Sequence, residues 1–536
     1  MKESTRLPPW ATAPWIAGAL TGLLIASVDR PQPAGWAAYA AFGAVCGGLA
    51  GSLWRSVVGA ERPRLLQAAL LSALGLRLAL GLAWGSLLPA YGNDVPHHAA
   101  GFFFPDSFVR DRSAWTIGRT DASLLESFDD AKGDQYGSLL FVTAMVYRLF
   151  GPEVDRTAIV TALAAAFGAL AVVPTWGFVR RVFGVGAAGI AAWWVALYPD
   201  AVLLGSQPMR EPFVLAGIAA ALYGYGLIRG VEAGSAARGG VRAGLGWIAG
   251  GCLLGLIVSP PFGAATAGLV GLAWVWEGRG GRRTSTVVLS ALALLCAVAL
   301  ALTIRAWAIE GGATGAGGAL SWWVAGVSFE LSELARASGW VQVIFGQTPA
   351  WSHPLLATAY GLLQPFLPAA LADNSGVALM RLVMIWRALG WFLGLPVLLY
   401  APFASIRREG MRSPSTYFTI VILVASLLIS YRFAGDQWDS PRYRTALLPF
   451  LASLVGWAWA EARSRRDRWL AWAYFLVAIE SLVVGWWYAG RYYHIPRLSL
   501  FRTVGIAAVL GALLIVLAFL VERGRRPALD GPAGDV

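Results

Sequence analysis

Residues 503–521 read TVGIAAVLGALLIVLAFLV, a run of 19 residues without one charged side chain. A helix needs about 20 apolar residues to cross the hydrocarbon core of a membrane. Comparable runs recur along the chain at 11–28, 36–57, 65–90, 156–179, 185–204, 212–228, 244–259, 262–276, 285–308, 380–404, 416–433, 445–461 and 469–488. The sequence therefore predicts an all-α, polytopic membrane protein of about 14 transmembrane helices.

The composition excludes the main soluble classes of protein. Of the 536 residues, 57% are hydrophobic and only 13% are charged, whereas soluble domains carry about 25% charged residues. This excludes a soluble enzyme, a disordered chain and a coiled coil. The net charge is +12, but the basic residues are scattered between apolar runs, so no nucleic-acid partner is expected.

The distribution of basic residues predicts the orientation of the spans. If the N-terminus is cytoplasmic, 23 of the 42 basic residues fall in short segments on the cytoplasmic side, as the positive-inside rule requires. No signal-peptide cleavage site follows the N-terminal segment, so the first apolar run is expected to remain as a helix. We expect an integral protein of the cell membrane with both termini in the cytoplasm.

Two long segments, 91–155 and 309–379, are predicted to form outer loops. The first contains ten of the 30 acidic residues. Within it, residues 136–150 (YGSLLFVTAMVYRLF) are too short to span and are expected to form an interfacial helix. Residues 353–370 are interrupted by three prolines and are expected to form a second interfacial or re-entrant piece.

Several short motifs follow one another in an order that resembles a known enzyme superfamily. They are FPDSFVRDRSAW (104–115), YRLFGPEVDR (147–156), ALYPD (196–200), PMREPF (208–213), LLQPFLP (362–368) and DSPRYRTALLPF (439–450). Their order resembles that of the GT-C superfamily of integral-membrane glycosyltransferases, in particular the protein O-mannosyltransferase and aminoarabinose transferase branch. The resemblance implies a catalytic core at 65–461, two added helices in 1–64, and C-terminal helices with a cytoplasmic tail in 462–536.

The resemblance also implies an activity. Such an enzyme transfers a sugar from a polyprenyl-phosphate donor to an envelope glycan, lipid or protein on the outer face of the membrane, with inversion at the anomeric carbon. No cofactor is predicted, and no metal site is assigned. Many members place a second acid beside the first-loop aspartate, but here Asp106 is followed by Ser107 and the next acid is Asp111. The question of a divalent cation therefore stays open.

Two acids are candidates for catalysis. The resemblance makes Asp106 the base that takes the proton of the acceptor hydroxyl; alternatively, Asp106 caps a helix that starts near Phe108. Glu211, between Arg210 and Pro212, is the candidate assisting acid, or simply a first-turn acid favoured by the helix dipole. Arg210 is a candidate phosphate ligand, or else it neutralises a neighbouring acid.

The outer segment GDQWDSPRYR (435–444) supplies further candidates. Its arginines oppose the positive-inside bias, and a guanidinium binds phosphate bidentately, so Arg442 and Arg444 are predicted to hold the donor phosphate. On a helix, residues two apart point about 200° apart, which favours one of the two facing the site. The resemblance adds Asp111 and Tyr443 to the expected substrate-binding residues.

Other charged residues and other functions remain as alternatives. Glu480 lies within an apolar run and is expected to pair with an arginine such as Arg77. Arg387 is expected to extend toward lipid headgroups. A transporter or flippase of a lipid-linked substrate would show broken helices that meet at the midplane. A polysaccharide polymerase or ligase is a third alternative, although the 309–379 loop carries only Arg336.

Overall fold

The computed structural model describes residues 9–29, 33–59, 61, 63–128, 134–151, 157–232, 239–277, 283–310, 315–337, 339–374 and 376–524. Within these ranges all regular structure is helical. The long helices are α1 (Pro9–Asp29), α2 (Pro33–Val58), α3 (Arg64–Tyr91), α7 (Thr157–Leu170), α8 (Val172–Val182), α9 (Val185–Leu197), α11 (Glu211–Glu232), α12 (Gly239–Val258), α13 (Pro260–Trp276), α14 (Arg283–Glu310), α15 (Gly315–Ala337), α19 (Ala378–Glu409), α20 (Pro414–Arg432), α22 (Leu448–Ser464), α23 (Trp469–Tyr492) and α24 (Leu500–Gly524).

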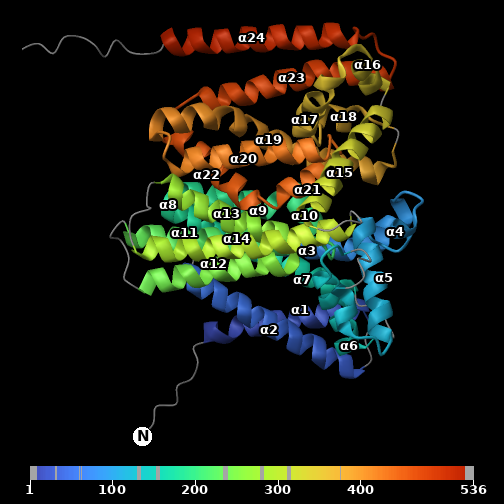
Figure 1. Cartoon of the computed structure of the whole chain (residues 1–536), viewed down its shortest axis with the longest axis vertical. Helices are drawn as coiled ribbons and strands as arrows, with labels where there is room; N and C mark the ends of the chain where they lie inside the picture. The colour runs from blue at the N-terminus through green and yellow to red at the C-terminus, as the bar shows by residue number, and fades with distance from the viewer. Residues whose placement is uncertain are drawn as a thin grey trace, which may run out of the picture.

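Shorter helices gather at one end of this bundle (Figure 1). They are α4 (Pro96–Ala99), α5 (Pro105–Arg119), η1 (Leu124–Phe128), α6 (Ser138–Phe150), α10 (Pro199–Gly205), α16 (Gly339–Gln347), η2 (Ala350–Ser352), α17 (His353–Leu363), α18 (Leu367–Ala372) and α21 (Asp439–Thr445). The helix expected at 136–150 forms as α6, and its position at the membrane interface stays a prediction. The 353–370 segment is divided between α17 and α18, so it makes no continuous span.

The number of spans agrees closely with the prediction. Among the described residues, 11 helices are long and apolar enough to cross a membrane, and two bent pairs raise the number to 13. The one predicted range that is not among these 13 described spans is 262–276. It forms α13, which with 17 residues is slightly shorter than the 18 counted as sufficient for a span. The chain is thus an all-α polytopic membrane protein. The predicted cytoplasmic tail after Gly524 and the first eight residues lie outside the described residues.

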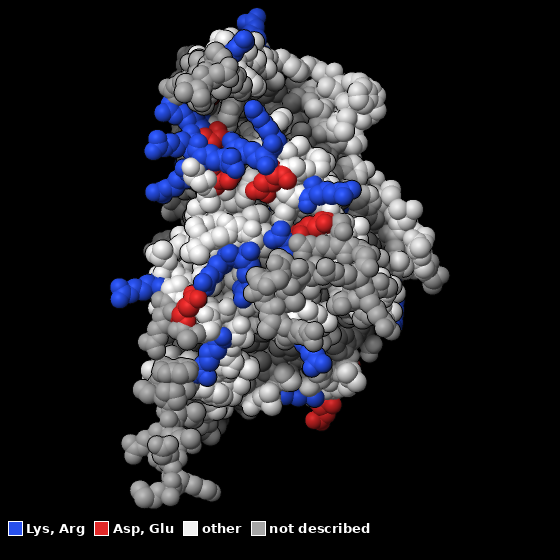
Figure 2. Space-filling view, turned by 90° about the vertical axis from the view of Figure 1, so that its left-hand side faces the viewer, with Lys and Arg blue, Asp and Glu red and all other residues white. Residues whose placement is uncertain are grey.

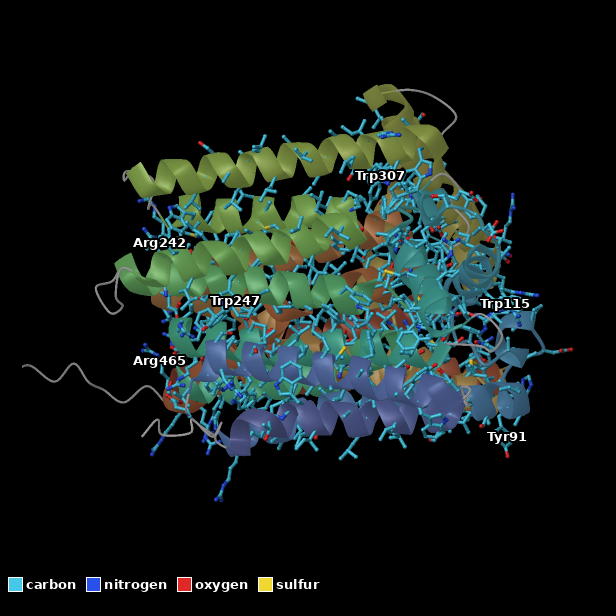
Figure 3. All side chains as sticks on the ribbon, turned by 90° about the horizontal axis from the view of Figure 1, so that it is seen from below. Tyr91, Trp115, Arg242, Trp247, Trp307 and Arg465 are labelled. Atoms are coloured by element: carbon cyan, nitrogen blue, oxygen red, sulfur yellow. The ribbon has the colours of Figure 1, made fainter. Side chains whose placement is uncertain are left out.

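One end of the bundle is rich in basic side chains. Figure 2 looks onto one end, where Lys and Arg side chains are numerous; Arg242 and Arg465 lie here, and Tyr91 and Trp115 lie at the opposite end (Figure 3). We call the first the basic end, and the other, which carries α5, α6, α10 and α21, the loop end. This separation matches the predicted distribution of segments between the two sides of the membrane.

Two bent helix pairs shape the loop end. The axes of α9 and α10 differ by 50°, and those of α21 and α22 by 73°. At the first bend, Pro199 has no N–H to donate to the carbonyl of Val195. Arg77 of α3 supplies the missing donor, because its Nη2 lies 3.1 Å from Val195 O and its Nη1 3.1 Å from Ala196 O. The predicted pairing of Arg77 with Glu480 is therefore wrong.

A second buried arginine also differs from expectation. Arg387 of α19 does not extend to the surface: its Nε donates to Asp200 Oδ1 of α10 at 2.5 Å, and both side chains are 2% exposed. Its guanidinium also lies over the ring of Trp438, 4.3 Å from the ring centroid. The pair Asp200–Arg387 thus fastens α10 to α19 beside the start of α21, because a buried charge must be paired.

Candidate active site

A tight turn places α21 across the loop end. The chain leaves α20 at Arg432 and reverses direction at Ala434 and Gly435, whose φ values are 42° and 87°. Glycine suits the second position because it adopts positive φ without steric cost. Asp436 Oδ1 then accepts from the backbone N–H groups of Trp438 and Asp439, at 2.7 and 2.5 Å, which stabilises the start of α21.

Arg442 on α21 gathers carboxylates from three parts of the chain. Its Nε donates to Glu211 Oε1 at 2.5 Å, and its Nη1 donates to Asp106 Oδ2 at 2.8 Å. Asp439, three residues earlier on α21, lies 3.6 Å from the same Nη1. Asp106 and Glu211, the two acids predicted to be catalytic, are thereby brought to one guanidinium. We call Asp106, Glu211, Asp439 and Arg442 the Arg442 cluster.

Several polar atoms of this region have no hydrogen-bond partner in the described part of the chain. They are the buried Glu211 Oε2, Arg442 Nη2 and Arg210 Nη1. Leaving a buried polar atom unsatisfied costs free energy, and native proteins do so rarely. A carboxylate oxygen and two guanidinium nitrogens are therefore available here to bind a polar ligand.

Asp106 is the accessible acid of the cluster. It lies in the first turn of α5, but the N-cap residue of that helix is Phe104, so the alternative prediction that Asp106 caps the helix is wrong. Its side chain is 45% exposed, against 5% for Glu211. Burial raises the pKa of Asp106, but the charge and hydrogen bond of Arg442 outweigh burial and leave the pKa below its usual value.

Glu211 begins α11, as expected for an acid in a first turn. The residue before it, Arg210, does not pair with it or with Asp200: Arg210 Nη1 lies 3.9 Å from Asp134 Oδ1, and its guanidinium faces the ring of Tyr136. Arg210 therefore sits beside the Arg442 cluster, where the charges of both Asp134 and Glu211 act on it.

Two residues near the site were not predicted to belong to it. Arg110, one turn after Asp106 on α5, donates from Nη1 to the carbonyl of Pro208 at 2.5 Å. Asp134 accepts from the N–H groups of Leu139 and Leu140 at the start of α6, at 2.8 and 2.9 Å. The position of Asp134 just before an apolar run is a helix-start signal that could have identified it. Both residues tie the first loop to the segment that carries Glu211.

Arg444 faces away from the Arg442 cluster. Its Nη1 lies 3.0 Å from Leu362 O and 3.5 Å from Gly361 O, and its Nη2 donates to Gln364 O. Its guanidinium lies over the ring of Trp391, 3.8 Å from the centroid. Arg444 thus holds the connection between α17 and α18, and of the two arginines only Arg442 contacts the predicted catalytic acids.

Asp111 and Tyr443 also have defined surroundings. Asp111 is buried and accepts from the hydroxyl of Tyr147 on α6 at 3.0 Å, so it joins α5 to α6. The ring of Tyr443 stacks on Phe433 with 4.5 Å between centroids, and Arg442 lies 5.7 Å from the centroid of Tyr443. Tyr443 therefore borders the Arg442 cluster, whereas Asp111 on α5 contacts α6.

The described residues contain no group of three or more His, Cys, Asp or Glu side chains arranged to hold a metal ion. At the Arg442 cluster the carboxylates face a guanidinium, and a guanidinium occupies the place that a cation would take between them.

Comparison with known proteins gives limited information. No protein-family model matches the chain, and no curated protein sequence matches it. Two solved structures of oligosaccharyltransferases from Archaeoglobus fulgidus are similar to it. One, in complex with an inhibitory peptide and a dolichol-phosphate, is 16% identical with a TM-score of 0.36, and the match covers 85% of this chain and 55% of that one.

The second structure is the apo form, 16% identical with a TM-score of 0.39; the match covers 83% of this chain and 54% of that one. The present chain thus spans about half the length of these proteins.

Proposed function

We propose that the chain is a glycosyltransferase that moves a sugar from a polyprenyl-phosphate donor to a hydroxyl of an envelope acceptor at the loop end. The observation that supports this most directly is that Arg442 joins Asp106 and Glu211, which are 336 and 231 residues away in sequence. A polar site at one end of an apolar bundle suits a substrate whose lipid tail stays in the membrane while its sugar is in water.

The proposed reaction is a single displacement. Asp106 accepts the proton of the acceptor hydroxyl, and the acceptor oxygen attacks the anomeric carbon. The bond between that carbon and the phosphate oxygen breaks, and its electron pair leaves with the phosphate. One displacement inverts the anomeric configuration. Arg442 Nη2 and Arg210 Nη1 are the available donors for the phosphate as it gains charge, and Glu211 fixes the orientation of Arg442.

The exposure of the two acids supports this division of roles. A base must reach the acceptor, and Asp106 is the accessible carboxylate. Glu211 is buried against Arg442 Nε, so its carboxylate is positioned to act on the guanidinium. The lowered pKa of Asp106 keeps it ionised at neutral pH, the state that a base requires. The same charge network lies at the end away from the basic end, which the positive-inside rule assigns to the outer side.

The test is transfer by the purified protein from a panel of radiolabelled polyprenyl-phosphate hexoses and pentoses to isolated envelope material. Asp106→Asn should lower the rate by about 10²- to 10⁴-fold, the usual contribution of a general base. Asp121→Asn is the matched control, because Asp121 is an exposed acid just after α5. Transfer by Asp106→Asn at the wild-type rate would refute the mechanism.

A transporter of a lipid-linked substrate is the second candidate, because broken helices are present. The bent pairs α9–α10 and α21–α22 carry Asp200 and Arg442. Their long members, α9 and α22, have 13 and 17 residues, so the bends lie toward the loop end rather than at the centre of a span. Movement of labelled polyprenyl phosphate across proteoliposomes by the Asp106→Asn variant, without sugar transfer by the wild type, would favour the transporter.

A further inference from the structure

Arg432, the last residue of α20, is held between aromatic rings at the loop end. Its guanidinium lies 5.2 Å from the ring centroid of Trp322 on α15 and 5.0 Å from that of Phe433. The guanidinium also lies directly against Gly326 of α15, where an added Cβ would clash with Arg432 Nη2. Stacking uses the face of a guanidinium and leaves its in-plane N–H donors available.

These donors distinguish Arg432 from three buried arginines of the loop end. Arg442 is bound to carboxylates, Arg387 to Asp200, and Arg444 to backbone carbonyls. By contrast, Arg432 Nη1 is buried and has no hydrogen-bond partner within the described part of the chain, and the acid whose charge acts on Arg432 is Glu330 of α15. A buried donor on a fixed cation favours an anion of matching geometry, and phosphate is the usual one.

A row of stacked rings connects Arg432 with the Arg442 cluster. Phe433 stacks on Tyr443 with their planes 12° apart, and Tyr443 adjoins Arg442. On the other side, Trp322 stacks on Trp307 of α14, with 4.9 Å between centroids. Figure 3 shows Trp307 toward the loop end of its helix. The row therefore leads from the Arg442 cluster to a helix at the edge of the bundle, whose side chains Leu294, Val298 and Leu300 are exposed.

We propose that Arg432 binds the phosphate of the polyprenyl-phosphate donor on the lipid side of the Phe433–Tyr443 pair, with the first isoprene units against Trp322 and Trp307. This inference rests on the proposed function and names a further ligand of its donor. The chemistry fits because a planar guanidinium recognises phosphate while the indole rings contact the apolar chain. Arg432 would thereby add a donor to Arg442 Nη2 and Arg210 Nη1, which the proposed reaction already assigns to this phosphate.

The experiment measures equilibrium binding of farnesyl phosphate, farnesol and inorganic phosphate to the full-length protein in nanodiscs. Arg432→Gln should weaken farnesyl phosphate binding by about tenfold and leave farnesol unchanged. Arg336→Gln is the matched control, because it removes an exposed, paired charge from α15. If inorganic phosphate bound as tightly as farnesyl phosphate, the site would serve a free phosphate, and the inference would be overturned.

Gly326→Ala is a second variant that keeps the charge. Its added methyl group displaces the Arg432 guanidinium, the flexible end of a side chain, so the fold should persist while farnesyl phosphate binding weakens. Wild-type binding by both Arg432→Gln and Gly326→Ala would overturn the role of Arg432 and leave the proposed transferase standing. If the wild type itself bound no farnesyl phosphate, the proposed function and this inference would both fall.

Discussion

The two arginines on opposite sides of α21 have different hydrogen-bond partners. Arg442 and Arg444 are two residues apart, yet one meets carboxylates and the other meets carbonyl oxygens and the ring of Trp391. The Arg442 side retains buried polar atoms without partners, including Glu211 Oε2 and Arg442 Nη2. The Arg444 side joins α17 to α18. Charge alone therefore does not identify a functional arginine. The chemistry of its partners distinguishes an arginine that binds a ligand from one that stabilises the fold.

The strongest test of this contrast is a substitution of Arg442. Arg442→Gln should lower transfer by about 10³-fold, because the base Asp106 loses its orienting cation and the phosphate loses a donor. It should also reduce thermal stability, since Glu211 is left buried and unpaired. The double variant Arg442→Gln, Glu211→Gln should regain stability without regaining activity. Transfer assays and thermal unfolding of the purified proteins measure both effects, and recovery of activity in the double variant would contradict the assignment.

The Arg444 side should respond in the opposite way. Arg444→Leu leaves carbonyl oxygens near α17 unpaired, which should cost about 3 kcal/mol of stability, since bonds to charged groups contribute about 1.5–3 kcal/mol each. The folded protein should keep a kcat within a few-fold of wild type. Denaturant titration and transfer kinetics check this. An unchanged stability with lost transfer would instead restore Arg444 as the phosphate ligand predicted from the sequence.

A similar contrast exists on α5 between Asp106 and Asp111. Asp111→Asn keeps an acceptor for the hydroxyl of Tyr147, so it should cost about 1 kcal/mol of stability and leave transfer nearly unchanged. Thermal unfolding and the KM for the donor are the measurements. A raised KM with unchanged stability would show that Asp111 contacts substrate, as the family resemblance implied.

The smallest effect that we expect is the pH dependence of farnesyl phosphate binding at Arg432. Burial, then the charges of Asp436 and Asp439, raises the pKa of Glu330 on α15 to about 7, while Arg432 opposes the shift and Glu333 adds to it. Below pH 7 Glu330 is neutral and leaves Arg432 uncompensated; above it, Glu330 is ionised and competes with an anion. Farnesyl phosphate binding should therefore weaken about threefold as pH rises through 7. Glu330→Gln should remove this dependence, and a persistent dependence would exclude Glu330 as its cause.

Much of the architecture could be predicted because it depends on local composition. The ranges of the spans and the short helix α6 follow from the lengths of apolar runs, and the segregation of Arg242 and Arg465 from Tyr91 and Trp115 follows from charge bias (Figure 3). The 23-residue helix α15 within the expected loop 309–379 was not predicted. Its mixture of small, aromatic and acidic residues matches neither a span nor a turn.

The partners of the charged residues could not be predicted in the same way. The sequence indicated that Asp106, Glu211 and one of Arg442 and Arg444 belong together, but the pairs Arg387–Asp200 and Arg210–Asp134 were missed, and Arg77 was assigned to the wrong partner. Arg432 was not singled out at all, because nothing in its immediate sequence reveals the rings of α15 that enclose it.

The sequence by itself determined that this chain is a helical membrane protein, and it assigned 23 of the 42 basic residues to one side of the membrane and an acidic first loop to the other. Hydrophobic burial and charge placement depend on short stretches of the chain, so they can be predicted directly from the sequence. Only the tertiary structure decided which arginine meets which acid, because the bends at Pro199 and before α22 fold distant segments onto one another. A buried ion pair requires contacts of a few ångströms between residues hundreds of positions apart, and only packing sets such contacts.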